Sequence, residues 1–368
     1  MMDPSNILES INDGVYVTDR DRRIVYWNKS AERITGWRVE DVVGKHCHDG
    51  MLCHEDKDGH RLCGEEYCPL HRSIVSGSSS TAPVIVFAKG RDGRRVPMRV
   101  SVAPVRTTDG EIVGGVETFR DLSEEIQDFL RAQKIQTLAV RQDLPPDDRI
   151  AVRTHYVPRD IIGGDFYAIS RLDQDRYGFL LADVCGHGVP AALYTMYLRS
   201  LWEENLRQFT TPAEFAAVLN RRLGDLIRED EPFAAAVVGR VDLAARTLSI
   251  AGAGGPSPLL FSRDGQCRPI ECSGTPLGLF KEAEYDQTQV PFSSGDCLLA
   301  FSDGAVEVSQ GEGDYLDVEG LVKCLQELGY PRQKVAFEDI ERAILQESNR
   351  VRLDDDLTFL EIRLAASV

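Results

Sequence analysis

The segment IIGGDFYAISRLDQDRYGFLLADVCGHG, residues 161–188, places two aspartates beside glycines and apolar runs. Asp165 follows a glycine pair, and Asp183 closes an apolar run that we expect to be a β-strand. Two further acidic motifs follow, FSDG with Asp303 and DDDLT at 354–358. Carboxylates in such positions can converge on hard divalent cations, which prefer oxygen ligands. The sequence therefore predicts a carboxylate metal centre in the C-terminal part of the chain.

The chemistry of such a centre narrows the expected activity. A pair of divalent ions can turn water into a nucleophile and hold a phosphate for in-line attack. We therefore expect metal-dependent phosphate hydrolysis. A kinase or cyclase output is not expected, because the sequence contains no glycine-rich phosphate loop with its lysine.

Length and charge bound the remaining classes of function. A chain of 368 residues with 42% apolar residues is expected to form two domains, or one large one. Almost all of the net charge of −17 falls after residue 120. This acidity argues against nucleic acid or an anionic membrane as a partner. The sequence has neither an apolar run of about 18 residues nor the blocks of a signal peptide, so we expect a cytoplasmic protein.

The N-terminal third of the sequence predicts a small α+β module. β-rich runs are followed by a short helix with Asn28 or Ser30 as its cap, and by three later strands separated by the turns GRDG and TTDG. The expected strands cover 14–19, 22–28, 83–89, 94–105 and 111–120. The motifs DGVYVTD, IVYWNKSAERITGW and VGGVETFRDLSEE resemble those of a PAS sensor domain. The resemblance spans roughly 4–123 and implies an antiparallel sheet with flanking helices in a domain at 1–120.

Residues 121–144 are expected to form a helical linker. The segment 121–143 lacks glycine and proline, and the prolines that follow end the helix. Its apolar stripe is an imperfect heptad repeat. Two interpretations remain open: a coiled coil that makes the protein a homodimer, and a solvated linker helix.

Residues 145–368 predict a larger domain in which strands and helices are layered. A helix is expected at 189–206, directly after GHG, and a second begins at a capping box on Thr211. A third helix is expected at about 334–349. The expected strands lie in RIAVRTHYVP, YGFLLADV, AAAVVGRVDL, TLSIAGAG, CLLAFSDG and DLTFLEIRL.

The four acidic motifs, in the order GGDFY, ADVxGHG, SDG and DDxT, resemble the SpoIIE/RsbU class of PPM-type serine/threonine phosphatases. The resemblance covers about 145–366. It implies an α-β-β-α sandwich fold, an α+β class for the whole chain, and a centre of two Mn²⁺ or Mg²⁺ ions. It further implies that water attacks phosphorus directly, with no phosphoenzyme intermediate.

The resemblance also implies the roles of single residues. Asp165 would hold one ion, Asp183 would bridge both, and Asp303 would hold the other. In DDDLT the family pattern aligns Asp355 as a ligand and Asp356 with a polar position, whereas Asp354 is expected at the surface. The implied catalytic carboxylates are Asp165, Asp183, Asp303 and Asp355, and the implied metal ligands are these four with the Val184 carbonyl and Asp356.

Several residues near these motifs need separate interpretation. His187 is expected either to act as a base or to fix the turn into the following helix. Cys185 is expected to be a small buried residue and no nucleophile. The sequence departs from the family at Ala168, Ala235 and Gly255, where Asp, Thr and His are frequent. None of these departures removes an implied ligand.

A cluster of cysteines and histidines lies in the N-terminal module. Cys47, Cys53, Cys63 and Cys68 are spaced C-x5-C-x9-C-x4-C, among five of the seven histidines. This spacing differs from that of common zinc sites. A metal ion, an iron–sulfur cluster, redox-active thiols, and a loop of buried thiols with exposed imidazoles all stay open. By the resemblance, the cluster faces the ligand cavity of a PAS domain, where haem or flavin is a further alternative.

Together these features predict a PAS-regulated phosphatase that hydrolyses phosphoserine or phosphothreonine on a protein. The resemblance implies a phosphorylated anti-sigma-factor antagonist of the STAS type as the substrate. The signal would pass through helix 121–143 to the strand that leads to Asp165. The alternative is a signal-dependent binding protein whose phosphatase domain is degenerate.

Overall fold

The computed structural model of the chain describes residues 3–56, 59–63, 67–80, 84–140, 146–226, 233–311, 314–332, 334–350 and 353–365. The chain divides after Phe129 into two compact units, which we describe separately. The division falls inside helix α5 (Ser123–Val140). The last residues of the predicted linker, 141–144, lie outside the described part of the chain.

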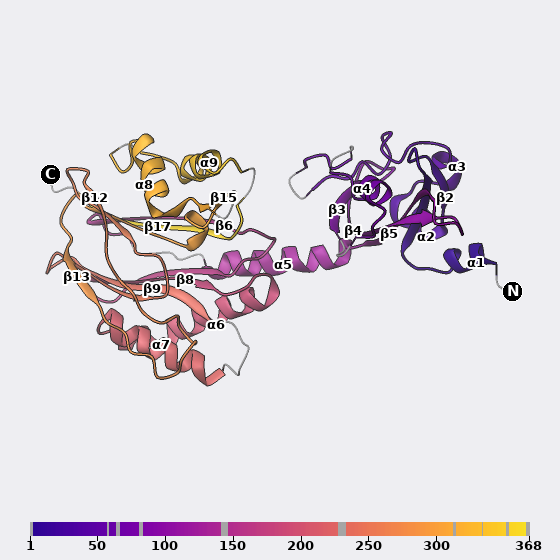
Figure 1. Cartoon of the computed structure of the whole chain (residues 1–368). Coiled ribbons are helices and arrows are strands. Elements are labelled where there is room, and N and C mark those ends of the chain that lie inside the picture. The colour runs from indigo at the N-terminus through magenta and orange to yellow at the C-terminus, as the bar shows by residue number, and fades with distance from the viewer. Residues whose placement is uncertain are drawn as a thin grey trace. The chain divides into compact units, whose positions relative to one another are not determined.

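The N-terminal unit is built on one antiparallel sheet in the order β2-β1-β5-β4-β3 (Figure 1). β1 pairs with both β2 and the distant β5, so that the first and last strands of the unit lie side by side. This arrangement confirms the predicted sheet with flanking helices. The strands are β1 (Gly14–Asp19), β2 (Ile24–Trp27), β3 (Val84–Lys89), β4 (Arg95–Arg106) and β5 (Ile112–Asp121).

Short helices flank this sheet. Asn28 caps the second of them, because its side-chain oxygen accepts a hydrogen bond from the Ala31 N–H at 2.8 Å. The same oxygen accepts from Val15 N–H at 2.9 Å, so one buried amide joins helix α2 to strand β1. The helices are α1 (Pro4–Glu9), α2 (Lys29–Thr35), α3 (Val39–Val42) and α4 (Pro69–Ser76).

The C-terminal unit contains two five-stranded antiparallel sheets. Their orders are β13-β10-β9-β8-β7 and β12-β11-β14-β17-β6. The first sheet comprises β7 (Asp165–Arg171), β8 (Arg176–Val184), β9 (Ala234–Asp242), β10 (Thr247–Ala253) and β13 (Thr288–Pro291). The second comprises β6 (Ile150–Val157), β11 (Leu259–Phe261), β12 (Cys267–Pro269), β14 (Cys297–Phe301) and β17 (Leu357–Leu364). A small hairpin, β15 (Ser309–Gly311) with β16 (Asp314–Tyr315), completes the strands described.

Helices cover the two outer faces of these sheets. Helices α6 (Val189–Asn205) and α7 (Pro212–Leu226) lie below the first sheet in Figure 1, and α8 (Asp317–Glu327) and α9 (Phe337–Glu347) lie above the second. Two short 3₁₀ turns are η1 (Leu206–Gln208) and η2 (Asp303–Ala305). Three apolar cores separate the layers: one under α6 and α7, one between the sheets, and one under α8 and α9. The predicted α-β-β-α sandwich is confirmed.

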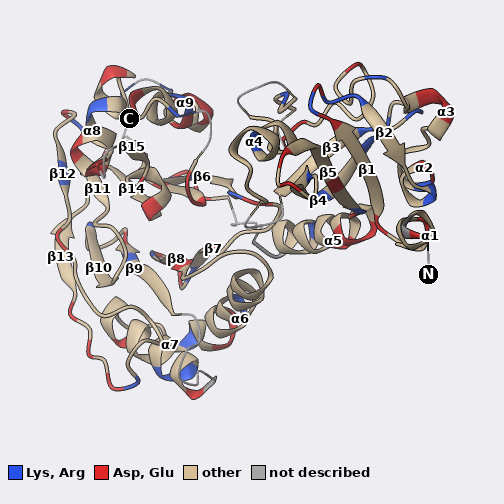
Figure 2. Ribbon diagram, turned by 45° about the vertical axis from the view of Figure 1, so that its right-hand side comes forward, with Lys and Arg blue, Asp and Glu red and all other residues tan. Residues whose placement is uncertain are grey.

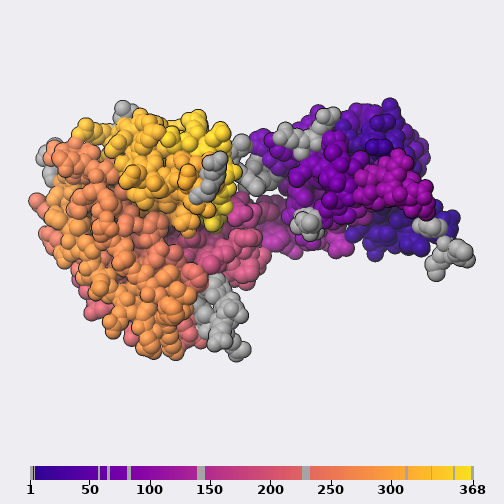
Figure 3. Space-filling view, viewed as in Figure 1, coloured from indigo at the N-terminus to yellow at the C-terminus, as the bar shows by residue number. Residues whose placement is uncertain are grey.

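The layered arrangement places the charged side chains of the outer helices on the surface. Helices α8 and α9 bury the apolar side chains Leu321, Leu325, Ile340 and Ile344 and turn acidic residues outward, which appear red in Figure 2. In the space-filling view of Figure 3 the residues of these helices belong to the yellow-orange region of the surface. Among the described residues, no helix combines the length and apolar character that crossing a bilayer requires.

Candidate metal centre

Two of the predicted ligands face each other across neighbouring strands. Asp165 is the first residue of β7, and its Cα partner in the antiparallel β8 is Asp183. Asp165 is buried, with 1% of its surface exposed, and Asp183 is partly buried. Like charges directly opposite each other destabilise a sheet. The β7–β8 pair therefore concentrates negative charge at the strand ends where the first two motifs meet.

The glycine pair before Asp165 is required by close packing. A Cβ atom on Gly163 would lie 2.2 Å from the Tyr156 hydroxyl and 2.3 Å from Oδ2 of Asp356. On Gly164 it would lie 2.9 Å from the Val184 carbonyl oxygen. Neither glycine has a positive φ, so neither is required for a left-handed backbone conformation. Glycine is needed at both positions because other groups approach this backbone closely.

Asp356 holds the same loop in place. Its Oδ2 accepts a hydrogen bond from Gly164 N–H at 2.5 Å, and its Oδ1 accepts one from Arg159 N–H at 2.6 Å. Both carboxylate oxygens of this buried residue are therefore engaged by the backbone. Among the described residues that were predicted as ligands, Asp356 is the one whose two carboxylate oxygens both accept backbone hydrogen bonds.

The remaining carboxylates come from the other sheet. Asp303 begins the turn η2 at the end of β14, and Asp355 precedes β17. The adjacent Ser302 joins these two strand ends, since its hydroxyl donates to the Asp356 carbonyl at 3.2 Å and accepts from Thr358 N–H at 2.9 Å. The FSDG glycine is needed here, because a Cβ on Gly304 would lie 2.0 Å from the same carbonyl oxygen. Two strand ends thus bring the third and fourth motifs together.

A single hydroxyl joins the two sheets at the site. Thr358 Oγ1, on β17, donates to Asp165 Oδ2 at 2.5 Å, and both residues are buried. A hydrogen bond to one carboxylate oxygen fixes its orientation and leaves the other oxygen, Oδ1, available. The sequence motif DDDLT contains Thr358, but the motif does not predict this contact with Asp165.

The charges of the four aspartates act on one another. Burial, followed by the charges of Asp303 and Asp355, raises the pKa of Asp183 to about 8. Burial and then Asp355 raise the pKa of Asp303 to about 6. Burial and the charge of Asp183 hold the pKa of Asp165 well above its ordinary value. Carboxylates from all four motifs therefore share one poorly solvated region.

This region has the chemistry of a divalent-cation site. Oδ1 of Asp165 and Oδ1 of Asp303 are buried and accept no hydrogen bond from the described residues. Buried carboxylate oxygens without donors are costly unless a cation compensates them. Among the described residues no three side chains already converge as they do around a bound metal. The fit to Mg²⁺ or Mn²⁺ therefore rests on the uncompensated oxygens and on the all-oxygen donor set.

The residues beside Asp183 differ in their exposure. Val184 is buried, and its N–H donates to the Gly164 carbonyl at 3.1 Å. Cys185 is exposed, so the expectation of a buried residue is wrong: the chain leaves the sheet at this point to enter the GHG turn. His187 is also exposed, with Nδ1 3.7 Å from Asp160 Oδ2.

The three departures from the family differ in their surroundings. Ala168 is fully buried on β7 in the core under α6 and α7. Ala235 is the Cα partner of Asp183 on β9. A Cβ on Gly255 would lie 3.0 Å from the backbone of Ala236, so a larger side chain would displace this backbone. None of the three residues is itself a predicted ligand.

The predicted cysteine cluster lies in the PAS unit, and the structure gathers its members unevenly. Cys47 and Cys68 are buried, whereas Cys53 and Cys63 are partly buried, and all are free thiols. Cys63 Sγ accepts a hydrogen bond from His54 N–H at 3.0 Å. Cys53 Sγ donates instead to the His48 carbonyl at 3.6 Å.

A buried carboxylate, which sequence reasoning missed, accompanies these thiols. Burial, followed by the charges of Glu117, Cys68 and Cys63, raises the pKa of the Cys47 thiol. Burial raises the pKa of Glu117 to about 8 and lowers the pKa of His54 to about 4. Burial therefore favours the neutral form of both groups, whose atoms His54 Nε2 and Glu117 Oε1 lie 3.5 Å apart. Alternation along β5 could have revealed Glu117, which shares the buried face with Phe119.

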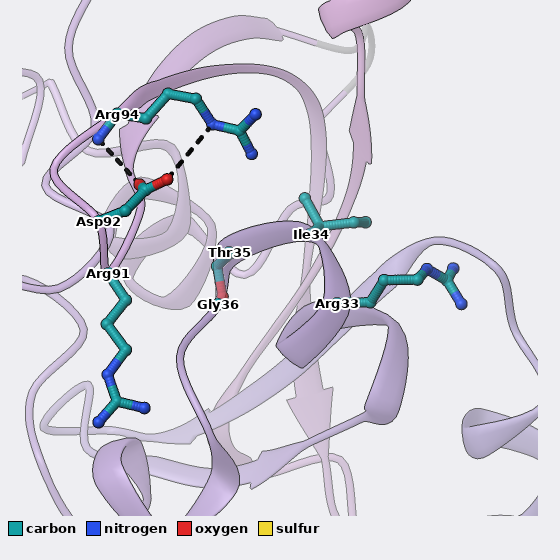
Figure 4. Close-up of a pocket in the computed structure, with 7 residues that line it drawn as sticks. All are labelled: Arg33, Ile34, Thr35, Gly36, Arg91, Asp92 and Arg94. Carbon is teal, nitrogen blue, oxygen red and sulfur yellow. Dashed lines mark hydrogen bonds and ion pairs between the residues drawn. The ribbon is translucent and has the colours of Figure 1, made fainter.

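A separate cavity of about 400 Å³ opens elsewhere on the PAS unit, between α2 and the β3–β4 turn (Figure 4). Three arginines line it, but they are already engaged. Arg33 donates to the Asn12 carbonyl at 3.1 Å, Arg91 pairs with Asp41 at 3.1 Å, and Arg94 Nε lies 3.9 Å from Asp92 Oδ2. Figure 4 shows the guanidinium groups of Arg33 and Arg91 on opposite sides of the cavity. None of the predicted site residues lines this cavity.

The fold and the carboxylate centre together define a PP2C-type phosphatase domain preceded by a PAS domain. Residues 173–365 match the family Stage II sporulation protein E (SpoIIE), and residues 3–122 match the PAS fold. The chain belongs to the SpoIIE family. Both predicted resemblances are thereby confirmed.

Comparison with individual proteins agrees with this assignment. The phosphoserine phosphatase RsbU of Bacillus subtilis is 23% identical over 306 residues, which cover 83% of this chain and 88% of RsbU. The phosphoserine phosphatase RsbP of the same organism is 27% identical over 179 residues, which cover 48% of this chain and 44% of RsbP. The SiaA-PP2C domain of Pseudomonas aeruginosa shares the fold, with a TM-score of 0.55 and 24% identity over 66% of this chain and 98% of that domain.

Proposed function

We propose that this chain is a PAS-regulated, metal-dependent phosphatase that hydrolyses phosphoserine or phosphothreonine on a protein. Two Mn²⁺ or Mg²⁺ ions would be held by Asp165, Asp183, Asp303 and Asp355, with the Val184 carbonyl as a further ligand. The observation that supports the proposal is the set of buried and partly buried carboxylates with raised pKa values and uncompensated oxygens at the ends of two sheets. Family membership and the phosphoserine phosphatases RsbU and RsbP support it.

The protein's own residues would position the carboxylates that hold the ions. When bound, the ion pair supplies an activated water and neutralises charge on the phosphoryl group. Thr358 orients Asp165 through its hydrogen bond to Oδ2. We assign Asp356 to holding the loop, because both of its oxygens accept backbone hydrogen bonds. The direction of the Asp165 carboxylate is thus set before substrate arrives.

We propose a phosphorylated anti-sigma-factor antagonist of the STAS type as the substrate. The support is the resemblance to RsbU over most of both chains. A panel of phosphorylated proteins, with and without a STAS fold, would test this choice. Equal rates on unrelated phosphoproteins would contradict it.

We further propose a homodimer that forms through helix α5. The helix exposes three apolar side chains, Leu130, Ile135 and Leu138, each with about half or more of its surface accessible. A second copy of the helix would cover them. Sedimentation at several concentrations would test this proposal, and a monomer at all of them would exclude it.

We propose that the thiols and the buried His54–Glu117 pair form the sensory site of the PAS domain. Thiolate and imidazole ligands suit zinc or an iron–sulfur cluster, and unligated thiols suit a redox pair. Metal and sulfide analysis of anaerobically purified protein separates these alternatives. Protein that lacks metal, sulfide and reversible thiol oxidation would exclude all three.

The central experiment is hydrolysis of a phosphoserine protein or p-nitrophenyl phosphate with added Mn²⁺. We expect activity that depends on Mn²⁺ and is abolished by a chelator. The alternative, a degenerate domain that only binds partners, predicts no hydrolysis even at saturating Mn²⁺. The degenerate domain stays an alternative because the sequence departs from the family pattern at Ala168 and Gly255.

A further inference from the structure

Helix α5 carries one buried polar residue where its apolar residues are exposed. Gln136 has 5% of its surface accessible, whereas Ile135 and Leu138 beside it are about 60% exposed. Within 131–138 it is the one residue classed as buried. On this part of the helix the apolar residues are exposed, so the hydrophobic effect contributes little to its position. The buried glutamine instead requires hydrogen bonds to a particular partner.

The partner is the backbone immediately before Asp165. Gln136 Nε2 donates to the Gly163 carbonyl at 2.8 Å, and Gly163 N–H approaches Gln136 Oε1 at 3.4 Å. The side-chain amide therefore spans both polar groups of this glycine. Its second donated bond goes to Thr195 Oγ1 on α6 at 3.1 Å, and Thr195 in turn donates to the Ala192 carbonyl at 2.8 Å.

This contact lies on the same short loop that Asp356 holds. Gly164, the next residue, donates its N–H to Asp356 Oδ2 at 2.5 Å, and its carbonyl accepts from Val184 N–H at 3.1 Å. Gln136 thus completes a set of contacts around residues 163 and 164. Because Asp165 follows directly, a displacement of Gln136 moves the backbone from which that carboxylate extends.

We propose that Gln136 is a positioning residue for the metal centre and that α5 is thereby part of it. This inference rests on the proposed function and adds a specific contact to it. The helix that leaves the PAS unit contributes the amide that fixes the GGD loop. Rotation or withdrawal of α5 removes a hydrogen bond from a buried carbonyl and releases the loop. The affinity of the centre for Mn²⁺ is then tied to the position of α5.

The first test compares full-length Gln136→Leu with the wild type. Leucine keeps the approximate size of the side chain but removes every hydrogen bond. We expect the Mn²⁺ concentration for half-maximal hydrolysis to rise by about tenfold, since an unpaired buried carbonyl costs on the order of one hydrogen bond. The rate at saturating Mn²⁺ should change much less. Gln127→Leu, an exposed glutamine on the same helix, is the matched control and should leave the Mn²⁺ dependence unchanged.

A second readout does not depend on activity. The Mn²⁺-induced rise in the unfolding temperature reports binding directly. We expect it to be reduced in Gln136→Leu at subsaturating Mn²⁺ and restored at high Mn²⁺. A merely structural role predicts lower stability without metal but an unchanged Mn²⁺ constant, and that result would overturn the proposal.

A milder variant guards against misfolding. Thr195→Val removes one partner of Gln136 and keeps the shape of the side chain. We expect a smaller shift in the same direction, and in the double variant with Gln136→Leu less than the sum of the two shifts in free energy. Fully additive shifts would show that the two residues act separately and would refute the coupled arrangement. If wild-type protein binds Mn²⁺ but hydrolyses nothing, the proposed function fails while the binding readout still decides the role of Gln136.

Discussion

Replacing Asp356 with alanine distinguishes a residue that holds the loop from a residue that holds metal. The change removes the acceptor of two N–H groups, the buried one of Gly164 and the partly buried one of Arg159. One unpaired buried donor costs about 1–3 kcal/mol, and loss of a like charge beside Asp165 offsets part of the total. We therefore expect the unfolding free energy of the metal-free C-terminal unit to fall by about 2 kcal/mol. For a unit of this size that corresponds to about 4–8 °C in Tm.

Asp355→Ala provides the contrast. The Asp355 side chain accepts a hydrogen bond from the adjacent Asp356 N–H at 2.8 Å, and its charge raises the pKa values of Asp183 and Asp303. Its removal relieves repulsion, so the metal-free Tm should stay within about 2 °C of the wild type or rise. The Mn²⁺-induced shift should be lost.

Differential scanning calorimetry in EDTA and in Mn²⁺ measures both quantities on the full chain. The transition of the C-terminal unit is identified by its response to Mn²⁺ in the wild type. Suppose instead that Asp356→Ala unfolds at the wild-type temperature without metal and loses the Mn²⁺ shift. Asp356 would then be a ligand, and its two backbone hydrogen bonds would contribute little.

Three further outcomes are expected. Asp183→Asn and Asp303→Asn should each lower the rate of phosphate hydrolysis by orders of magnitude with unchanged circular dichroism; full activity in either would contradict the assigned ligands. Chelation of divalent ions should lower the Tm of the C-terminal unit and Mn²⁺ should restore it, because a ligand that binds only the folded state stabilises it; a Tm indifferent to both would argue against a bound cation. Glu117 should weaken the PAS transition as pH rises from 4.5 through 8, because its pKa is raised from 4.5 to about 8: the stability it gives is fully present below 4.5 and is lost once pH has passed 8. His54, with its pKa lowered from 6.5 to about 4, acts in the opposite direction, because its contribution is lost as pH falls from 6.5 through 4. The net loss should therefore fall between pH 6.5 and 8, and Glu117→Gln should remove it in a thermal-melt series across pH.

Local signals in the sequence predicted much of the fold. The Asn28 cap and the start of α7, where Glu214 N–H donates to Thr211 Oγ1 at 3.2 Å, depend on neighbouring residues and could be predicted. β7 was missed because its residues are buried in pairs and show no alternation. Helix α8 was missed as well, because its first turn holds a glycine and acidic residues that are typical of a loop.

The metal centre likewise has a part that the sequence predicts and a part that it does not. The four acidic motifs could be recognised in the sequence because they occur together and in the order that is typical of one phosphatase class. The supporting contacts could not. Thr358 meets Asp165 across 193 positions, and Gln136 meets Gly163 across 27, so neither contact leaves a local pattern. A glutamine on a linker helix is ordinarily expected to face solvent.

The direct pairing of Asp165 with Asp183 has a consequence for the lifetime of the protein. Without a cation, two carboxylates face each other across β7 and β8, and the metal-free unit carries that repulsion whenever both are ionised. Proteases act on transiently opened chains, and the population of such chains rises as stability falls. Scarcity of divalent metal would therefore shorten the survival of the protein in the cell. The amount of phosphatase, as well as its turnover, would follow the metal supply.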